Sequence, residues 1–315
     1  MELLFLGTSS GTPTKDRNVT AIALIESQRK NWYLIDCGEG TQHQILRTSL
    51  SLNSLGAIFI THIHGDHCYG LPGLLASAGM QGRTAPLTLV APKAIRDWLS
   101  STQALIKLYL PFELNFISSE ELPILDLGQF TISLAKLSHR APSYAYSFTE
   151  RKVEASLNIE KLRVSGIPQG PLWGKLRAGI NIIHQGQEYP FAEFLLYEQK
   201  PRKIVICGDN DSPELLKDFC IDSNILVHES TYTEDMAEKA AKAGHSYAKQ
   251  VASFAERASV PILILTHFSP RYQLGTGTTP SIDDVHCEAQ SVYSGNLQLA
   301  SDFKRFQLDK SGNLK

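Results

Sequence analysis

The sequence has little of what would place a protein in a class by composition alone. Its 315 residues include 30 Lys and Arg and 32 Asp and Glu, so the net charge of −2 points to no particular partner. No stretch approaches the ~18 apolar residues that a transmembrane helix needs. The first residues, Met1–Gly7, lack the basic start of a signal peptide and read as a strand. These absences predict a protein with no membrane segment, in which any nucleic-acid contact depends on a local basic patch.

Cysteine is also scarce. The five cysteines are odd in number and form no Cys-x-x-Cys pair, which favours reduced thiols in a cytoplasmic protein over a disulfide framework. Cys68 and Cys207 lie beside residues of metal-ligand type, but we interpret both as small buried core residues.

What the sequence does contain is a dense group of metal-ligand side chains. The segment Thr61–His67 reads Thr-His-Ile-His-Gly-Asp-His and follows the apolar run Leu55–Ile60, which predicts a buried strand. Neutral imidazoles and a carboxylate suit zinc or a similar cation. The candidate ligands here are His62, His64, Asp66 and His67. Four ligands from one short segment predict two metals close together, whereas a surface histidine tract would not explain the buried strand before them.

Later predicted strands also end in residues of this kind. They are Phe130–Leu137 before His139, Lys203–Cys207 before Asp209, and Ile262–Leu265 before His267. His139 is expected to complete the shell of the first metal, and Asp209 stands where a bridging carboxylate belongs. Asp36 also follows a strand and fits either the support of a ligand or the capping of a turn. Polar residues at so many strand ends favour two sheets with helices outside and a site along one edge.

Residues 151–185 differ from the rest in composition. Six Lys and Arg stand against two Glu here, a net charge of +4, and Gly and Pro recur. Such a segment predicts a protruding basic arm able to follow a phosphate backbone, with a plain solvated insertion as the alternative.

Three expectations concern secondary structure. Tyr109–Ile117 reads as one strand, and Thr231 with Glu234 has the spacing of a capping box for the helix that follows. From Leu274 onward the chain is polar, and the sequence predicts no element there.

The signature His62-x-His64-x-Asp66-His67, with the three later strand-end ligands, resembles the metallo-β-lactamase superfamily over nearly the whole chain. Shorter motifs are similar to the short form of the tRNase Z (ribonuclease Z) family. These are Gly11-Thr12-Pro13 with Arg17-Asn18, His228-Glu229-Ser230-Thr231, Gly244-His245-Ser246, Thr266–Tyr272, and Gly166 with Gly170-Pro171 in the basic segment. Two residues depart from the family pattern, Asn210 and Tyr247, where Thr is usual.

The resemblance implies a single α/β domain over residues 1–315, a four-layer αβ/βα metallo-β-lactamase-type sandwich with a protruding exosite arm at 151–185. It implies two Zn2+ per chain, a homodimer in which each arm serves the partner's active site, and precursor tRNA as substrate. The first zinc would take His62, His64 and His139, and the second Asp66, His67 and His267, with Asp209 bridging. The implied activity is endoribonucleolytic removal of the 3′ trailer, which leaves a 3′-hydroxyl on the tRNA.

The same family resemblance and the chemistry of the side chains suggest roles for further residues. Asp66 can accept a proton from the attacking water, and His245, oriented by Glu229, can donate one to the departing 3′ oxygen. Arg271 is expected to bind a phosphate. Residues expected to border the pocket for the 3′ end or to contact tRNA are Arg17, Asn18, Gly170 and Pro171.

Two rival functions remain at this point. One is another dinuclear-zinc hydrolase on the same scaffold, such as a small phosphodiesterase, a lactonase or a thioesterase. The basic segment and the pair of His245 with Glu229 count against it, since such enzymes need neither. The other rival is a non-catalytic RNA-binding protein with a relict site, and the complete set of ligands argues against it.

Overall fold

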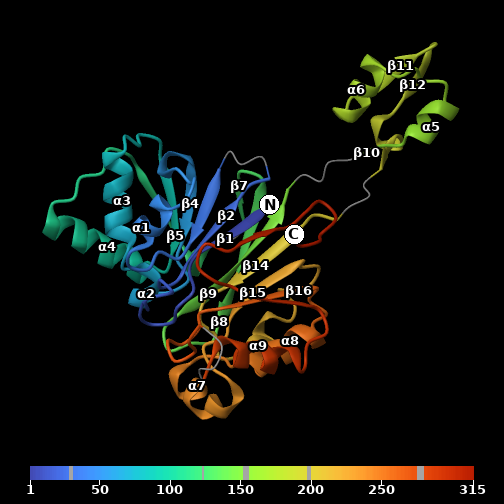
Figure 1. Cartoon of the computed structure of the whole chain (residues 1–315). Coiled ribbons are helices and arrows are strands. Elements are labelled where there is room, and N and C mark those ends of the chain that lie inside the picture. The colour runs from blue at the N-terminus through green and yellow to red at the C-terminus, as the bar shows by residue number, and fades with distance from the viewer. Residues whose placement is uncertain (28–30, 123, 152–155, 197–199, 275–279) are drawn as a thin grey trace. The chain divides into compact units, whose positions relative to one another are not determined.

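The computed structural model describes the chain except for residues 28–30, 123, 152–155, 197–199 and 275–279. The chain divides into two compact units (Figure 1). The larger unit comprises Met1–Thr149 and Lys203–Lys315, and the smaller unit is Glu150–Arg202.

The larger unit is built on two sheets of seven strands each. The first sheet has the order β18 (Arg305–Gln307), β1 (Glu2–Gly7), β2 (Ala21–Ile25), β3 (Trp32–Ile35), β4 (Leu55–Phe59), β5 (Leu87–Ala91) and β6 (Leu114–Ser118). The second has the order β17 (Asn296–Leu299), β16 (Ile262–Thr266), β15 (Ile225–Glu229), β14 (Lys203–Cys207), β9 (Ser143–Glu150), β8 (Phe130–Leu137) and β7 (Leu125–Leu127). Strands β3 to β6 are parallel in the first sheet, and strands β14 to β17 are parallel in the second.

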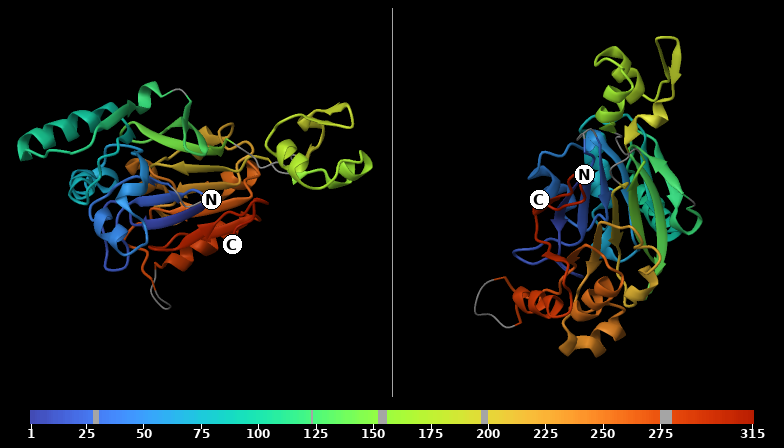
Figure 2. Two further views of the ribbon diagram at one scale, coloured as in Figure 1. Left: turned by 90° about the horizontal axis from the view of Figure 1, so that it is seen from above. Right: turned by 90° about the vertical axis from the view of Figure 1, so that its right-hand side faces the viewer.

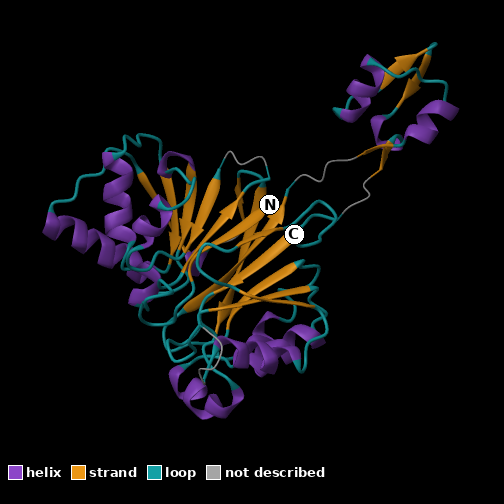
Figure 3. Ribbon diagram, in the orientation of Figure 1, coloured by secondary structure: helices purple, strands orange, loops and turns teal. Residues whose placement is uncertain are grey.

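Helices cover the outer face of each sheet, while the strands lie inside (Figures 2 and 3). The first sheet is covered by α1 (Thr41–Leu46), α3 (Leu71–Met80) and α4 (Lys93–Ile106), and the second by α8 (Ala248–Arg257) and α9 (Ile282–Gln290). The short helices α2 (Gly65–Cys68) and α7 (Ala237–Ala243) lie in loops between strands. The predicted four-layer sandwich is therefore confirmed.

The alternation of side chains along each strand explains why the layers form. In β14, Ile204 and Ile206 join the core between the two sheets, whereas Val205 and Cys207 face the helices on the outside. The core between the sheets holds Phe59, which meets the ring of Phe148 edge to face at 5.2 Å. A strand that is apolar on both faces is expected where both are covered.

Several local expectations need correction. The strand β6 begins only at Leu114, because the preceding turn contains Pro111, which has no N–H to donate to a ladder. The capping box at Thr231 and Glu234 is wrong, since the Thr231 hydroxyl donates to Glu229 instead. A capping box does occur at Ser281, in the C-terminal region that the sequence left without elements. That region also supplies β17 and β18, which complete one edge of each sheet.

The smaller unit, Glu150–Arg202, contains the basic segment 151–185 and continues beyond it. Its elements are β10 (Ser156–Leu157), α5 (Ile159–Val164), α6 (Pro171–Arg177), β11 (Ile182–His184), β12 (Gln187–Tyr189) and β13 (Leu195–Leu196). It has an apolar core of its own around Leu162, Leu176 and Phe194. Lys152 and Glu154, which count toward its predicted charge, lie outside the described residues.

Candidate metal centre

The seven candidate ligands come together where strands of both sheets end. They follow β4, β8, β14 and β16, in keeping with the rule that open α/β sheets place their sites beyond the carboxyl ends of strands. The structure groups them as His62, His64, His139 and Asp209, and as Asp66, His67 and His267. Within each group the potential ligand atoms lie within 4.8 Å of one another.

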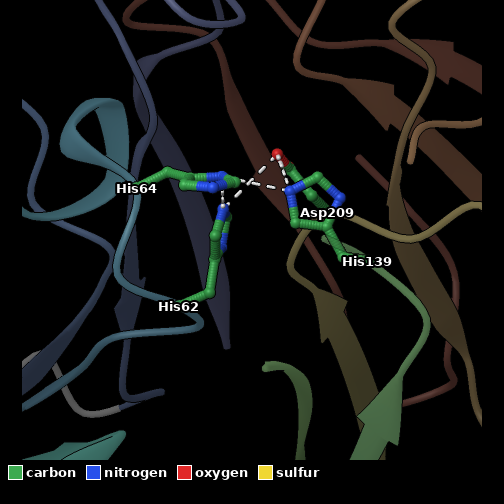
Figure 4. Close-up of side chains that lie close together, drawn as sticks. All are labelled: His62, His64, His139 and Asp209. Carbon is green, nitrogen blue, oxygen red and sulfur yellow. Dashed lines mark hydrogen bonds and ion pairs between the residues drawn. The ribbon is translucent and has the colours of Figure 1, made fainter. Parts of the chain in front are cut away.

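In the first group, the side chains of His62, His64, His139 and Asp209 point toward one another (Figure 4). The Nδ1 atom of His64 lies 3.0 Å from Nε2 of His62 and 3.1 Å from Nε2 of His139. Asp209 approaches the same nitrogens with Oδ2, at 3.5 Å from His62 and 3.8 Å from His139.

The second group lies on the other side of Asp209. The Nε2 atoms of His67 and His267 are 3.2 Å apart, and Asp66 Oδ2 is 3.5 and 3.3 Å from them. Asp209 faces these two imidazoles with its other oxygen, Oδ1, at 3.5 and 3.4 Å. One carboxylate thus faces both groups, which is the arrangement expected of a bridging ligand.

The outer nitrogens of four histidines show that the inner ones fit a cation. Each Nδ1 contacts an oxygen that acts as an acceptor, so each Nδ1 carries the proton and each Nε2 turns a lone pair inward. The pairs are His67 with Asp36 at 2.7 Å, His139 with the Gly244 carbonyl at 2.6 Å, His62 with Thr61 Oγ1 at 3.0 Å and His267 with Thr231 Oγ1 at 3.0 Å. Lone pairs facing each other at about 3 Å repel unless positive charge lies between them.

The electrostatics of the buried groups agree with this fit. Burial holds the pKa of His62 well below its usual value, and burial also lowers the pKa of His139, so both rings are neutral as ligands must be. Burial acts to raise the pKa of Asp209, but the imidazoles around it hold that pKa well below the usual range. For His67 the effect of Asp209, Asp66 and Asp36 exceeds that of burial and raises the pKa well above its usual value. The carboxylates therefore favour a cation on the lone pair of its Nε2, which can be a second proton or a metal ion.

His245 and Glu229 form a second functional unit beside the cluster. Glu229 ends β15 and is 1% exposed, and its Oε1 accepts a hydrogen bond from His245 Nδ1 at 3.0 Å. Although burial acts to lower it, Glu229 raises the pKa of His245 to about 9. His245 Nδ1 is also 3.7 Å from Asp209. The structure thus brings together the pair that the sequence suggested.

The remaining predicted residues have different surroundings. Arg271 follows the ligand His267 closely, and its Nη1 is buried without a hydrogen-bond partner among the described residues. Arg17 is 5% exposed and donates from Nη2 to the Tyr272 carbonyl at 2.6 Å, and Asn18 donates from Nδ2 to the Glu39 carbonyl at 3.0 Å. These contacts give Arg17 and Asn18 a part in holding the loops around the cluster.

Gly170 and Pro171 open α6 in the smaller unit, where the φ of +146° at Gly170 requires glycine.

Some groups that shape the site were not found from the sequence. The Thr61 hydroxyl contacts Asp36 and His62, and the Thr231 hydroxyl donates to Glu229 at 2.6 Å while it contacts His267. The amide of Gly11 donates to Asp66 Oδ2 at 2.7 Å. Both threonines stand in motifs noted from the sequence, Thr61 directly before His62 and Thr231 two residues after Glu229. Only the folded chain shows which groups their hydroxyls contact.

Comparisons with known proteins agree with the geometry. A family model described as Anti-Pycsar protein Apyc1 matches residues 1–153. Ribonuclease Z of Pseudomonas putida strain W619 is 51% identical over 315 residues, which cover 100% of this chain and 98% of that protein. Ribonuclease Z of Marinobacter nauticus is 47% identical over 317 residues, with coverage of 100% and 98%.

Among solved structures, human tRNase Z, short form, is 26% identical with a TM-score of 0.68, and the match covers 98% of this chain and 100% of that one. The metallo-β-lactamase fold protein YhfI from Bacillus subtilis shares the fold, with a TM-score of 0.65 and 18% identity. That match covers 96% of this chain and 98% of YhfI. Among the described residues, the structure contains no candidate membrane-spanning helix. With full-length relatives at this identity, the chain belongs to the ribonuclease Z family and has the metallo-β-lactamase fold.

Proposed function

We propose that this chain is a zinc-dependent endoribonuclease that removes the 3′ trailer from precursor tRNA. The products would be a tRNA with a 3′-hydroxyl and a trailer with a 5′-phosphate. The observation that carries the proposal is the placement of the His245–Glu229 pair beside seven converging metal-type ligands in a member of this family.

The ligand set supports two Zn2+ ions. His62, His64 and His139 would hold one, and Asp66, His67 and His267 the other, with Asp209 between them. Such a pair of ions supplies an activated water at neutral pH and offsets the charge that develops on a phosphodiester.

The protein's own groups then have separate tasks. Asp66 is oriented by the Gly11 amide and can accept the proton of the attacking water. Glu229 occupies Nδ1 of His245, which leaves Nε2 to carry a proton to the departing 3′ oxygen. The guanidinium of Arg271, four residues after the candidate ligand His267, would bind a non-bridging phosphate oxygen.

The smaller unit supports tRNA as the substrate. Arg163, Lys175 and Arg177 are exposed on it, whereas Lys161 pairs with Glu193. We propose that this unit is the arm that contacts tRNA, with Gly170 and Pro171 in it, and that the chain acts in the cytoplasm as a homodimer in which each arm serves the partner's active site.

The test of the activity is incubation of the protein with a 3′-extended tRNA, with and without a chelator, followed by mapping of both product ends. We expect one cut near the discriminator nucleotide that the chelator abolishes and added zinc restores. Cleavage that ignores the chelator, or product ends with a 3′-phosphate on the tRNA, would refute the proposal.

A deletion separates tRNA processing from small-substrate hydrolysis on the same fold. Removal of residues 151–201 with a short Gly-Ser connection keeps Glu150 and Arg202, whose main chains hydrogen-bond at 3.0 Å and whose side chains form an ion pair. Hydrolysis of a small phosphodiester should survive, while cleavage of precursor tRNA should collapse. An equal loss of both activities would remove the support that the arm gives to this substrate.

His245→Ala separates a nuclease from an RNA-binding protein with a relict site. Affinity for precursor tRNA should stay near that of the unaltered protein, while single-turnover cleavage falls about 100-fold or more, the range typical of a lost general acid. Unchanged cleavage would exclude the proton-donor role.

A further inference from the structure

An exposed tyrosine lies next to the candidate metal centre. Tyr69 directly follows α2, two residues after His67, and 63% of its surface is exposed. Of the other tyrosines that the structure describes, only Tyr109 is as exposed, at 84%. Apolar packing does not account for a ring that is mostly open to solvent.

The ring of Tyr69 is held against the backbone of the ligand segment. Gly65 lies between the candidate ligands His64 and Asp66, and a Cβ atom there would be only 2.2 Å from a ring carbon of Tyr69. The ring also lies beside Trp98 of α4, with centroids 6.3 Å apart and planes inclined by 39°. Glycine at position 65 therefore allows an aromatic surface to form within one residue of two candidate ligands.

We propose that Tyr69 is a stacking platform for an unpaired nucleobase adjacent to the phosphodiester that is cut. This inference rests on the proposed function, since it names a contact of the same substrate. A phosphate bound at the metal centre to which His64 and Asp66 would contribute ligands places its flanking nucleotides within reach of a ring that lies against Gly65, the residue between them. Stacking suits this task because every base has an aromatic face, so tRNAs of different sequence are all accepted.

The test is a double-mutant cycle that combines a change in the protein with a change in the RNA. The variants are Tyr69→Leu, which removes the ring, Tyr69→Phe, which keeps it, and Tyr109→Leu as the matched control at an exposed tyrosine on the loop after α4. The probes are a 3′-extended tRNA and two copies with an abasic nucleotide on one or the other side of the cleavage site. Affinity is measured with zinc present in the His245→Ala background, in which the ligands are intact and cleavage is slow, so that binding is read without turnover.

We expect Tyr69→Leu to weaken binding of the intact RNA roughly 5- to 100-fold, the range for one stacked base. Tyr69→Phe and Tyr109→Leu should stay within about twofold of the unaltered protein. One abasic RNA should bind the unaltered protein as weakly as Tyr69→Leu binds the intact RNA, with little further loss when both changes are combined.

Three results would overturn the inference. The first is that the affinity losses from Tyr69→Leu and from the abasic nucleotide multiply when the two changes are combined. The second is an unchanged affinity of Tyr69→Leu for the intact RNA. The third is a lower molar mass of Tyr69→Leu in light scattering, which would assign the ring to a contact between copies of the chain. Failure of the proposed function is distinguishable, because the unaltered protein would then not cleave the precursor at all.

Discussion

Asp36→Asn tests how the metal cluster is held together. Asp36 directly follows β3 and is 1% exposed. Its carboxylate accepts hydrogen bonds from His67 Nδ1 at 2.7 Å and from the Thr61 amide at 2.8 Å. Its φ is +60°, a conformation that asparagine also adopts readily. The substitution therefore preserves shape and backbone while it removes one negative charge beside a candidate ligand.

The expected magnitude follows from that hydrogen bond. A hydrogen bond to a charged group contributes about 1.5–3 kcal/mol, and each 1.4 kcal/mol is a factor of ten in affinity. We therefore expect zinc affinity to fall about 10- to 100-fold, which agrees with typical losses for groups that orient a metal-binding histidine. The fold should persist, because the amide oxygen still accepts from Thr61.

The assay is competition for zinc against a chromogenic chelator, with circular dichroism as the check on folding. Asp302→Asn is the matched control, because Asp302 accepts hydrogen bonds from Thr8 at 2.8 Å and from the Asn18 amide at 2.7 Å but belongs to neither ligand group. Its zinc affinity should stay unchanged. The reasoning is refuted if folded Asp36→Asn binds zinc as tightly as the unaltered protein, or if both variants lose affinity equally.

Three further variants test other parts of the structure. Gly244→Ala places a Cβ atom 2.9 Å from His139 Nδ1, at a position whose φ is +75°. The clash displaces the His139 ring, so the amount of bound zinc should fall when it is measured by native mass spectrometry. Full zinc occupancy would contradict this contact. Thr231→Val removes the hydroxyl that donates to Glu229, so the free energy of unfolding in urea should drop by about 1–3 kcal/mol, and an unchanged midpoint would show that the hydroxyl is dispensable. Phe148→Ala empties part of the core between the sheets and should cost about 3–5 kcal/mol in the same assay, whereas a loss below 1 kcal/mol would mean that this core is loosely filled.

The fold class was readable from the sequence because apolar strands and polar strand ends are local patterns. The runs that became β4, β14 and β16 each end a few residues before a ligand. Short or polar elements were less readable. The strand β18 has one buried residue, Phe306, and pairs with β1 across the whole length of the chain. Its partner, and not its own composition, makes it a strand.

The residues that carry metal-type chemistry were readable for a similar reason. A group of imidazoles and carboxylates such as His62 to His67 is rare without a ligand to hold. The residues expected to contact the substrate were harder to read from the sequence. Arg17 is buried and donates a hydrogen bond to the Tyr272 carbonyl. Arg271 has a buried nitrogen without a hydrogen-bond partner among the described residues. The sequence shows that a guanidinium is present, but its partners come from loops that meet only after folding.

By itself, the sequence determined the long apolar strands with polar residues at their ends, the types of donor in the site and the candidate pair of His245 with Glu229. Tertiary structure alone decided which nitrogen of each histidine faces inward. His139 is oriented by the carbonyl of Gly244, 105 positions away, and His67 meets His267 across 200 positions. Such choices belong to the fold because a ring nitrogen takes its role from the acceptor opposite it, and only chain folding brings that acceptor there.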